Sequence, residues 1–433
     1  MSTNDKPTVI IVGAGLGGLM MGALFEKSGV PYTIFERAVA VKPLGSAMSI
    51  GPTLLPIFQQ MGIYDDILAA GKYMTHTVAY QENQENYRPA DYRPVEEFTG
   101  YGHYIIDRPT YYNIMLKQVP AHKIHFGKRV TDIIEKDDKV TIHLSDGETH
   151  EGDTVVGADG AYSSVREHMY EKLMANGLLP KEDQEDLPFS CTCLVGQTKV
   201  LDPEEFPCIK DPICQFHIVR GEEKPYTEAM EQRFRNSENS GEWGAASAQT
   251  MCDETRNFAV NLSDGKKRTL GDLYDLAPKE LVSKVMLEEK VFKTWHHGRI
   301  VLMGDACHKL NPAGGHGAVT AMHDAIALAN LIYAQPTKTS GDITNLFEEY
   351  QKERLPAVME SFENSKIMSK LSDRGITGAI LVFIMTHMPF WLWKLALKKT
   401  IKFRPQGSVI PVISPSEQKA RALFEKQRQA ASI

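Results

Sequence analysis

The feature that most constrains the fold is a glycine-rich turn near the N-terminus. Residues 8–12 form a short apolar run rich in β-branched side chains, typical of a strand buried on both faces of a parallel sheet. The turn that follows fits the pattern G-x-G-x-x-G. In that pattern Gly13 permits the tight turn, Gly15 lets the backbone approach a pyrophosphate, and Gly18 lets helix and strand pack closely.

The residues after the turn complete a strand–helix–strand unit. Helix-forming residues run up to Gly29, and a second strand over residues 32–35 leads to Glu36. A carboxylate there can accept hydrogen bonds from ribose hydroxyls and would repel a 2′-phosphate, so NADP is disfavoured. We also expect Arg37 to contact the cofactor. The unit predicts a bound dinucleotide without separating FAD from NAD; the alternative is a surface turn with Glu36 in solvent.

Two further segments each join a strand to an acidic glycine turn. Residues 153–156 lead into 157–166, which contain Asp159 before a helix expected from 163 or 164. Residues 299–303 lead into Gly304 and Asp305, and a glycine-rich stretch over 312–318 precedes a helix over 319–333. An acid at a strand end before a glycine-rich turn is usually functional.

These three motifs, in this order, resemble those of the class A flavin monooxygenases, the group that includes para-hydroxybenzoate hydroxylase. The chain looks closer still to fungal members that act on aromatic or terpenoid metabolites, and the resemblance spans roughly residues 8–360. It implies an α/β fold: a Rossmann-type, glutathione-reductase-like FAD-binding domain with an inserted, mainly β substrate domain and a helical C-terminal tail. The implied resident cofactor is FAD.

The resemblance also implies roles for single residues. Asp305 would bond the ribityl chain, and the N–H groups of Gly317 and Ala318 would approach flavin N1 and O2, where a helix N-terminus stabilises negative charge. Asp159 would contact FAD and NAD(P)H, or could serve only as a turn and capping residue. The remaining expected FAD contacts are Ser49 in a flavin-covering loop, Arg108 at the phosphate or ring edge, and Val130 beside the adenine. Arg108 has the alternative of a surface residue at a helix start.

The expected reaction follows from the resemblance and from the single dinucleotide fingerprint. FAD would stay bound while NAD(P)H visits, and the family uses O2 to form a flavin C4a-hydroperoxide. This would hydroxylate or epoxidise an electron-rich, lipophilic aromatic or isoprenoid molecule. An oxidase or reductase without oxygen insertion, and a non-catalytic flavin-binding membrane-associated protein, are the alternatives.

Catalytic side chains are harder to assign from the residues. His217 and Tyr226 are candidates for steering or deprotonating a phenol, and His308 for positioning the pyrimidine end of the flavin. Each could instead be an ordinary structural residue. The cysteines show no Cys-x-x-Cys pair, so no metal site is expected, and reduced thiols fit a cytoplasmic protein.

The motifs divide the chain into three parts. Residues 1–75, 101–180 and 286–365 are expected to form the FAD-binding domain, and 76–100 with 181–285 the substrate domain. Within the latter, 194–200, 214–219 and 256–260 are expected strands, and 231–243 a surface helix followed by a loop. Residues 366–433 are expected to form a helical C-terminal region.

The C-terminal region contains an apolar segment over 375–393 without Asp, Glu, Lys or Arg, followed by several lysines. It suits an interfacial or substrate-entrance helix making peripheral membrane contact, a buried or homodimer helix, or a membrane span. The polar N-terminus lacks the pattern of a signal peptide. A net charge of -7 argues against a nucleic-acid partner, so the expected partners are a small-molecule substrate and O2.

Overall fold

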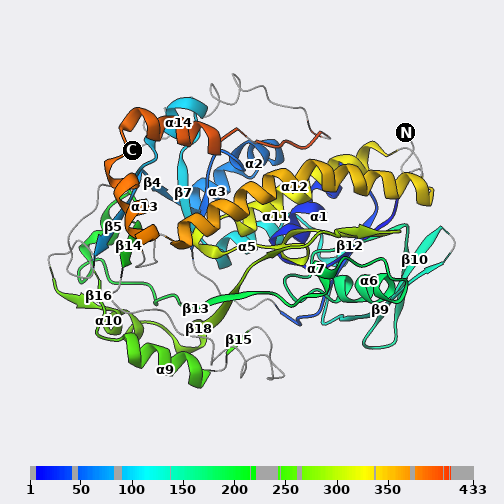
Figure 1. Cartoon of the computed structure of the whole chain (residues 1–433), viewed down its shortest axis with the longest axis horizontal. Coiled ribbons are helices and arrows are strands. Elements are labelled where there is room, and N and C mark those ends of the chain that lie inside the picture. The colour runs from blue at the N-terminus through cyan, green and yellow to red at the C-terminus, as the bar shows by residue number, and fades with distance from the viewer. Residues whose placement is uncertain are drawn as a thin grey trace.

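A six-stranded, mostly parallel sheet forms the centre of the larger part of the molecule (Figure 1). The computed structural model describes residues 6–40, 47–81, 90–136, 138–214, 216–220, 242–243, 245–260, 266–335, 338–370, 376–402, 404–408 and 410. In sheet order the strands are β20 (His296–His297), β21 (Ile300–Leu302), β12 (Thr154–Gly157), β1 (Val9–Val12), β2 (Tyr32–Glu36) and β8 (Ile124–Phe126). Every residue of β1, β12 and β21 is buried, as the apolar runs predict for strands covered on both faces.

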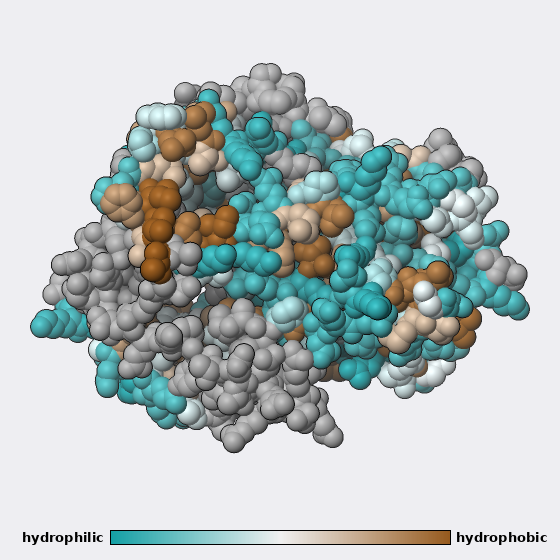
Figure 2. Space-filling view, viewed as in Figure 1, coloured by the Kyte–Doolittle hydropathy of each residue, from teal (hydrophilic) through white to brown (hydrophobic). Residues whose placement is uncertain are grey.

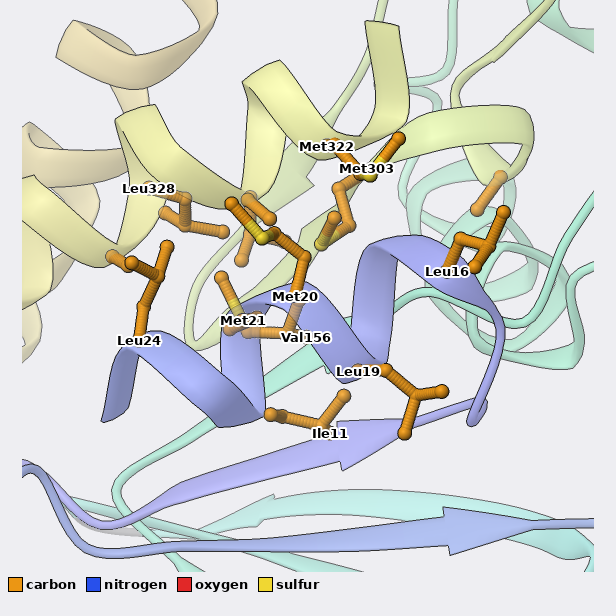
Figure 3. Packing of buried hydrophobic residues seen from close by; sticks show 14 of the residues in the cluster. Ile11, Leu16, Leu19, Met20, Met21, Leu24, Val156, Met303, Met322 and Leu328 are labelled. Atoms are coloured by element: carbon orange, nitrogen blue, oxygen red, sulfur yellow. The ribbon is translucent and has the colours of Figure 1, made fainter. Parts of the chain in front are cut away.

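Helix α1 (Leu16–Ser28) covers one face of this sheet and is itself covered by α11 (Gly317–Ala334). Figure 3 shows α1 between the strand that carries Ile11 and helix α11, with Met20 and Met21 among the packed side chains. Gly29 ends α1 in the left-handed conformation, φ 66°, which confirms the expected C-terminal glycine. The first and third motifs therefore meet at α1, and the second meets the first at Gly13, beside Ala158.

Smaller antiparallel sheets flank the central one. Their strands are β3 (Ala47–Ile50), β7 (His103–Asp107) and β4 (Lys72–Met74) in one, β9 (Val130–Lys136), β10 (Lys139–Leu144) and β11 (Thr149–Gly152) in another, and β19 (Lys290–Val291) with β22 (His308–Lys309) in a third. The helices between these strands are α2 (Leu55–Met61), α3 (Tyr64–Ala70), α4 (Arg93–Thr99), α5 (Arg108–Leu116), α6 (Ser164–Ala175) and α7 (Lys181–Gln184).

Within its described residues, the expected substrate lobe contains two further three-stranded sheets and a pair of short strands. One sheet is β14 (Phe216–Arg220), β5 (His76–Gln81) and β6 (Ala90–Asp91); the other is β13 (Phe189–Val195), β18 (Ser283–Glu288) and β15 (Glu242–Trp243). Helices α9 (Ala245–Thr255) and α10 (Leu270–Asp275) accompany them, with β16 (Ala259–Val260) paired to β17 (Arg268–Thr269). Figure 1 shows these elements on the side of the molecule away from β9 and β10.

Several expected strands have different bounds in the structure. The strand predicted over 194–200 ends at Val195, because its partner β18 begins opposite that residue, at Ser283. Only the last two residues of 256–260 pair, as β16. The end of the predicted surface loop pairs with β18 as β15, while 231–241 lie outside the described residues. The expected domain boundary at 285 falls inside β18.

In the part of the chain that the structure describes, three helices follow the central domain. Helix α12 (Ser340–Lys370) runs across the molecule, so the expected boundary at 365 falls inside a continuous helix. The apolar segment forms two helices, α13 (Ile376–His387) and α14 (Phe390–Thr400), because Pro389 begins a new helix. Among the described residues, no helix is long and apolar enough to cross a membrane. The tail from residue 411 lies outside the described residues.

Candidate functional site

The glycine turn after β1 has the geometry that a dinucleotide requires. Gly13 has φ +110°, and a Cβ there would lie 2.4 Å from the carbonyl oxygen of Ala158. A Cβ on Gly18 would lie 2.1 Å from the carbonyl oxygen of Gly13. At Gly15, which begins α1, a Cβ would meet nothing within 4 Å, and no side chain caps the helix. Two of the glycines are thus required by packing, whereas the third leaves the helix N-terminus open for a phosphate.

Glu36 lies at the end of β2 and binds the glycine turn directly. Its Oε2 accepts a hydrogen bond from the N–H of Ala14 and its Oε1 one from the N–H of Ala38, both at 2.8 Å. This carboxylate is therefore held at the mouth of the turn, where the sequence predicts a ribose contact. The neighbouring Arg37 is exposed.

Asp159 follows β12 and organises the start of α6. Its carboxylate accepts hydrogen bonds from Ser163 Oγ at 2.5 Å and from Ser164 Oγ and the Val165 N–H, each at 3.2 Å. Burial raises the pKa of Asp159, and these donors act in the opposite direction. The capping role weighed from the sequence is thus present; contact with FAD or NAD(P)H stays a prediction.

Asp305 lies on a one-turn 3-10 helix, Gly304–Ala306, which packs against α11. No described residue donates a hydrogen bond to its carboxylate, which is only half-buried. Burial raises the pKa of Asp305, while the charge of Arg108 acts against that rise. A partly buried carboxylate without an internal donor is costly unless a ligand supplies one.

The N-terminus of α11 is the second open helix end of the site. Gly317 is its first residue and Ala318 its second, and the N-cap residue His316 makes no side-chain capping bond. A Cβ on Gly317 would meet nothing within 4 Å. The first N–H groups of any helix lack partners inside it, so this end can bind an electron-rich group.

Three other expected cofactor contacts occupy different elements. Ser49 lies on β3 opposite Ile105, and the exposed Arg108 is the first residue of α5. Val130 begins β9 and its side chain is buried, which leaves its backbone as the group that a ligand could reach. Their contacts with FAD stay predictions.

The structure gives no support to direct catalysis by His308. Its ring is fully buried, packs against Trp295, and places Nε2 2.6 Å from Asp324 Oδ2. These contacts fit the alternative of a packing residue. His217 pairs with Val78 through the β14 backbone, and Tyr226 lies outside the described residues.

Sequence reasoning missed the buried ions behind the Asp305 turn. Asp324 on α11 accepts hydrogen bonds from Arg354 Nε at 2.7 Å and from the Gly304 N–H at 3.0 Å. Arg166 on α6 donates to the Ala306 carbonyl at 2.8 Å. A usable signal was present, because Arg354 falls on the buried stripe of α12 with Tyr350 and Val358, where an unpaired charge would be costly.

Together these features define a Rossmann-type dinucleotide-binding protein whose site joins two open helix N-termini and two carboxylates. A family model described as "FAD binding domain" matches residues 6–179 and 243–365, and the chain belongs to this family. Its cofactor is FAD. The open turn at Gly15, the Asp305 carboxylate, which no described residue hydrogen-bonds, and the uncapped start of α11 fit that cofactor.

Relatives with the same organisation are fungal and bacterial. The chain is 27% identical to the FAD-dependent monooxygenase atmM of Aspergillus flavus, over 100% of this chain and 92% of that protein. It is 28% identical to the FAD-dependent monooxygenase paxM of Penicillium paxilli, over 86% and 80%. Its fold is similar to that of Klebsiella pneumoniae HpxO complexed with FAD and uric acid, with TM-score 0.69, 19% identity, and coverage of 92% and 97%.

Proposed function

We propose that this FAD-binding protein is a monooxygenase. It takes electrons from NAD(P)H and inserts one oxygen atom of O2 into an electron-rich, lipophilic aromatic or isoprenoid small molecule. The observation that carries the proposal is the half-buried Asp305 carboxylate, which lacks a donor among the described residues and lies on a turn packed against α11, whose N-terminus is open. The names of the fungal relatives, which are similar over most of the chain, supply the reaction class.

The residues of this chain hold and polarise the cofactor. Bound FAD supplies hydride acceptance and oxygen chemistry. The N-terminus of α1 binds its pyrophosphate, while Glu36 and Asp305 accept hydrogen bonds from its hydroxyl groups. The N–H groups of Gly317 and Ala318 would donate to the flavin ring system and favour negative charge on it.

The test follows FAD reduction in purified, FAD-loaded protein mixed rapidly with NADH or NADPH. A panel of phenols and isoprenoids is screened for compounds that accelerate the reduction, and the mass of each product is then measured by mass spectrometry. A gain of one oxygen atom is the expected result. Reduction without any oxygenated product would favour an oxidase or reductase. FAD that neither nucleotide reduces, with every compound, would favour a non-catalytic flavin-binding protein.

We also propose that α13 and α14 make peripheral contact with a lipid surface on the cytoplasmic side. Figure 2 shows hydrophobic residues gathered over these helices, and Phe383 and Trp391 are 62% and 65% exposed. Trp393 attaches helix α14 to the rest of the protein, because its Nε1 donates to the Asp91 carbonyl at 2.7 Å. The exposed apolar side chains of α14 are therefore held on a helix with a fixed position. Aromatic side chains beside lysines suit a membrane interface. Pairing of two copies through this face is the competing outcome.

A further inference from the structure

Buried charged side chains hold the turn that carries Asp305 from both sides. On one side the Gly304 N–H donates to Asp324 Oδ2 at 3.0 Å; on the other, Arg166 Nη1 donates to the Ala306 carbonyl at 2.8 Å. Both bonds are buried. The backbone immediately before and after Asp305 is thus fixed by residues that lie far away in the sequence.

The turn depends on these bonds because its own conformation is restrictive. Gly304 has φ +60°, and a Cβ there would lie 2.9 Å from the Cβ of Ala321 on α11. Asp305 itself receives no hydrogen bond from the described residues. The direction of its carboxylate is therefore set by the backbone of the turn and by whatever holds that backbone.

Asp324 is anchored in turn by two other elements. Arg354 of α12 donates Nε to Oδ1 at 2.7 Å, and Nε2 of His308 lies 2.6 Å from Oδ2. All three side chains are at most 1% exposed. Although burial alone would raise the pKa of Asp324, the nearby His308 and Arg354 lower it well below its usual range. This carboxylate stays charged and ties α11, α12 and β22 to the Gly304 N–H.

Arg166 connects the same turn to the Asp159 segment. Its Nη2 donates to the Ala161 carbonyl at 2.7 Å, and Arg166 lies in the first turn of α6, which Ser163 caps. Ser163 Oγ also donates to Asp159 at 2.5 Å. A single guanidinium therefore bridges the second and third motifs, which follow the paired strands β12 and β21.

We infer that Asp324 and Arg166 are positioning residues of the FAD site. They act through the backbone of Gly304 and Ala306 to aim the Asp305 carboxylate at the cofactor. The inference rests on the proposed function in one respect, namely that Asp305 binds FAD. It adds that the affinity for FAD is set by a buried network that touches no cofactor atom, as supporting side chains orient the ligands of metal sites.

The test is a pair of double-mutant cycles on the FAD dissociation constant, measured by titration of apoprotein. Asp324→Asn keeps the shape and an acceptor oxygen but removes the charge; it should weaken FAD binding about tenfold in the wild-type background. In an Asp305→Ala background the same change should weaken binding by less than about twofold, because Asp305 is no longer there to be aimed. Arg166→Lys, a milder change that keeps the charge, should show the same pattern.

Ile326→Ala is the matched control, because Ile326 is a fully buried residue of α11 whose apolar side chain donates and accepts no hydrogen bond, so its truncation creates a cavity but removes no bond to the turn. Any effect it has on FAD binding should be equal in both backgrounds. If Asp324→Asn and Arg166→Lys each weaken FAD binding by the same factor in the wild-type and Asp305→Ala backgrounds, the inference is overturned. If Asp305→Ala alone leaves FAD binding unchanged, the cofactor-site assignment fails instead, so the two failures are distinguishable.

Discussion

Glu36 Oε2 accepts a hydrogen bond from the main-chain N–H of Ala14, with the nitrogen and the oxygen 2.8 Å apart. The acidic end of β2 and the glycine turn after β1 are therefore one unit before any cofactor binds. The second oxygen of the carboxylate is held by the Ala38 N–H. Because each oxygen can accept more than one hydrogen bond, the group can stabilise the turn and still bind a ribose.

Replacement of Glu36 by alanine should therefore affect both stability and FAD binding. Two partly buried N–H groups lose their acceptor, which should cost about 1–3 kcal/mol in the free energy of unfolding. The affinity for FAD should fall about tenfold or more. Chemical denaturation and FAD titration measure the two effects. Glu26→Ala, which removes an ion pair with Lys123, is the control and should leave FAD affinity unchanged.

Asp305→Asn should change stability and FAD affinity in opposite directions. The pKa of this carboxyl is raised by burial, so above that pKa the unpaired charge destabilises the apoprotein. Its removal should raise the apoprotein melting temperature at neutral pH by about 1–2 °C, while FAD affinity falls about tenfold or more. A variant that purifies with its full complement of FAD would show that Asp305 does not hold the cofactor.

The stability of the fold should depend on His323 in weak acid. Burial lowers the pKa of His323 to about 3, and its Nε2 lies 3.1 Å from the Thr53 carbonyl oxygen. Below pH 6.5, the ordinary pKa of histidine, His323 is protonated in the unfolded chain but stays neutral in the folded chain. The free energy of unfolding therefore falls as the pH falls. The contribution should be about 2 kcal/mol between pH 6.5 and pH 5.

His323→Gln should remove this part of the pH dependence, because an amide can donate to Thr53 without titrating. Unfolding curves in urea at each pH give the comparison, with the exposed His122→Gln as the control. If the two variants show the same slope of stability against pH, the buried His323 is not its source.

The α13–α14 surface should bind vesicles through its apolar side chains. Replacing Phe383 and Trp391 together by serine should reduce co-sedimentation with phosphatidylserine vesicles at least about tenfold. The control replaces Met174 and Leu178, which are 53% and 63% exposed elsewhere on the molecule. Unchanged sedimentation combined with loss of a dimer in the double variant would identify a protein interface instead.

The fold was predictable where its signals are local. The apolar strands before Gly13, Gly157 and Gly304 pair in one parallel sheet, since each motif carries its own strand, turn and helix start. The second strand ends at Glu36 as the sequence indicates.

The unpredicted parts depend on contacts between distant segments. The pairing of β14 with β5 joins residues that no local pattern relates. The role of His308 could not be read from its motif, because its partner Asp324 and the charge of Arg354 come from two later helices. A buried ion network is specified by three-dimensional packing. The only sign of it in the sequence is a single arginine, Arg354, among the apolar residues of one helix face.

The most direct test of the central claim is oxygen incorporation from isotope-labelled O2. FAD-loaded protein is incubated with NAD(P)H, labelled O2 and the compound that most accelerates FAD reduction, and the product is analysed by mass spectrometry. We predict a product that carries one labelled oxygen atom, and loss of that product in Asp305→Ala. NAD(P)H oxidation that yields hydrogen peroxide, with no label in any organic product, would contradict a monooxygenase.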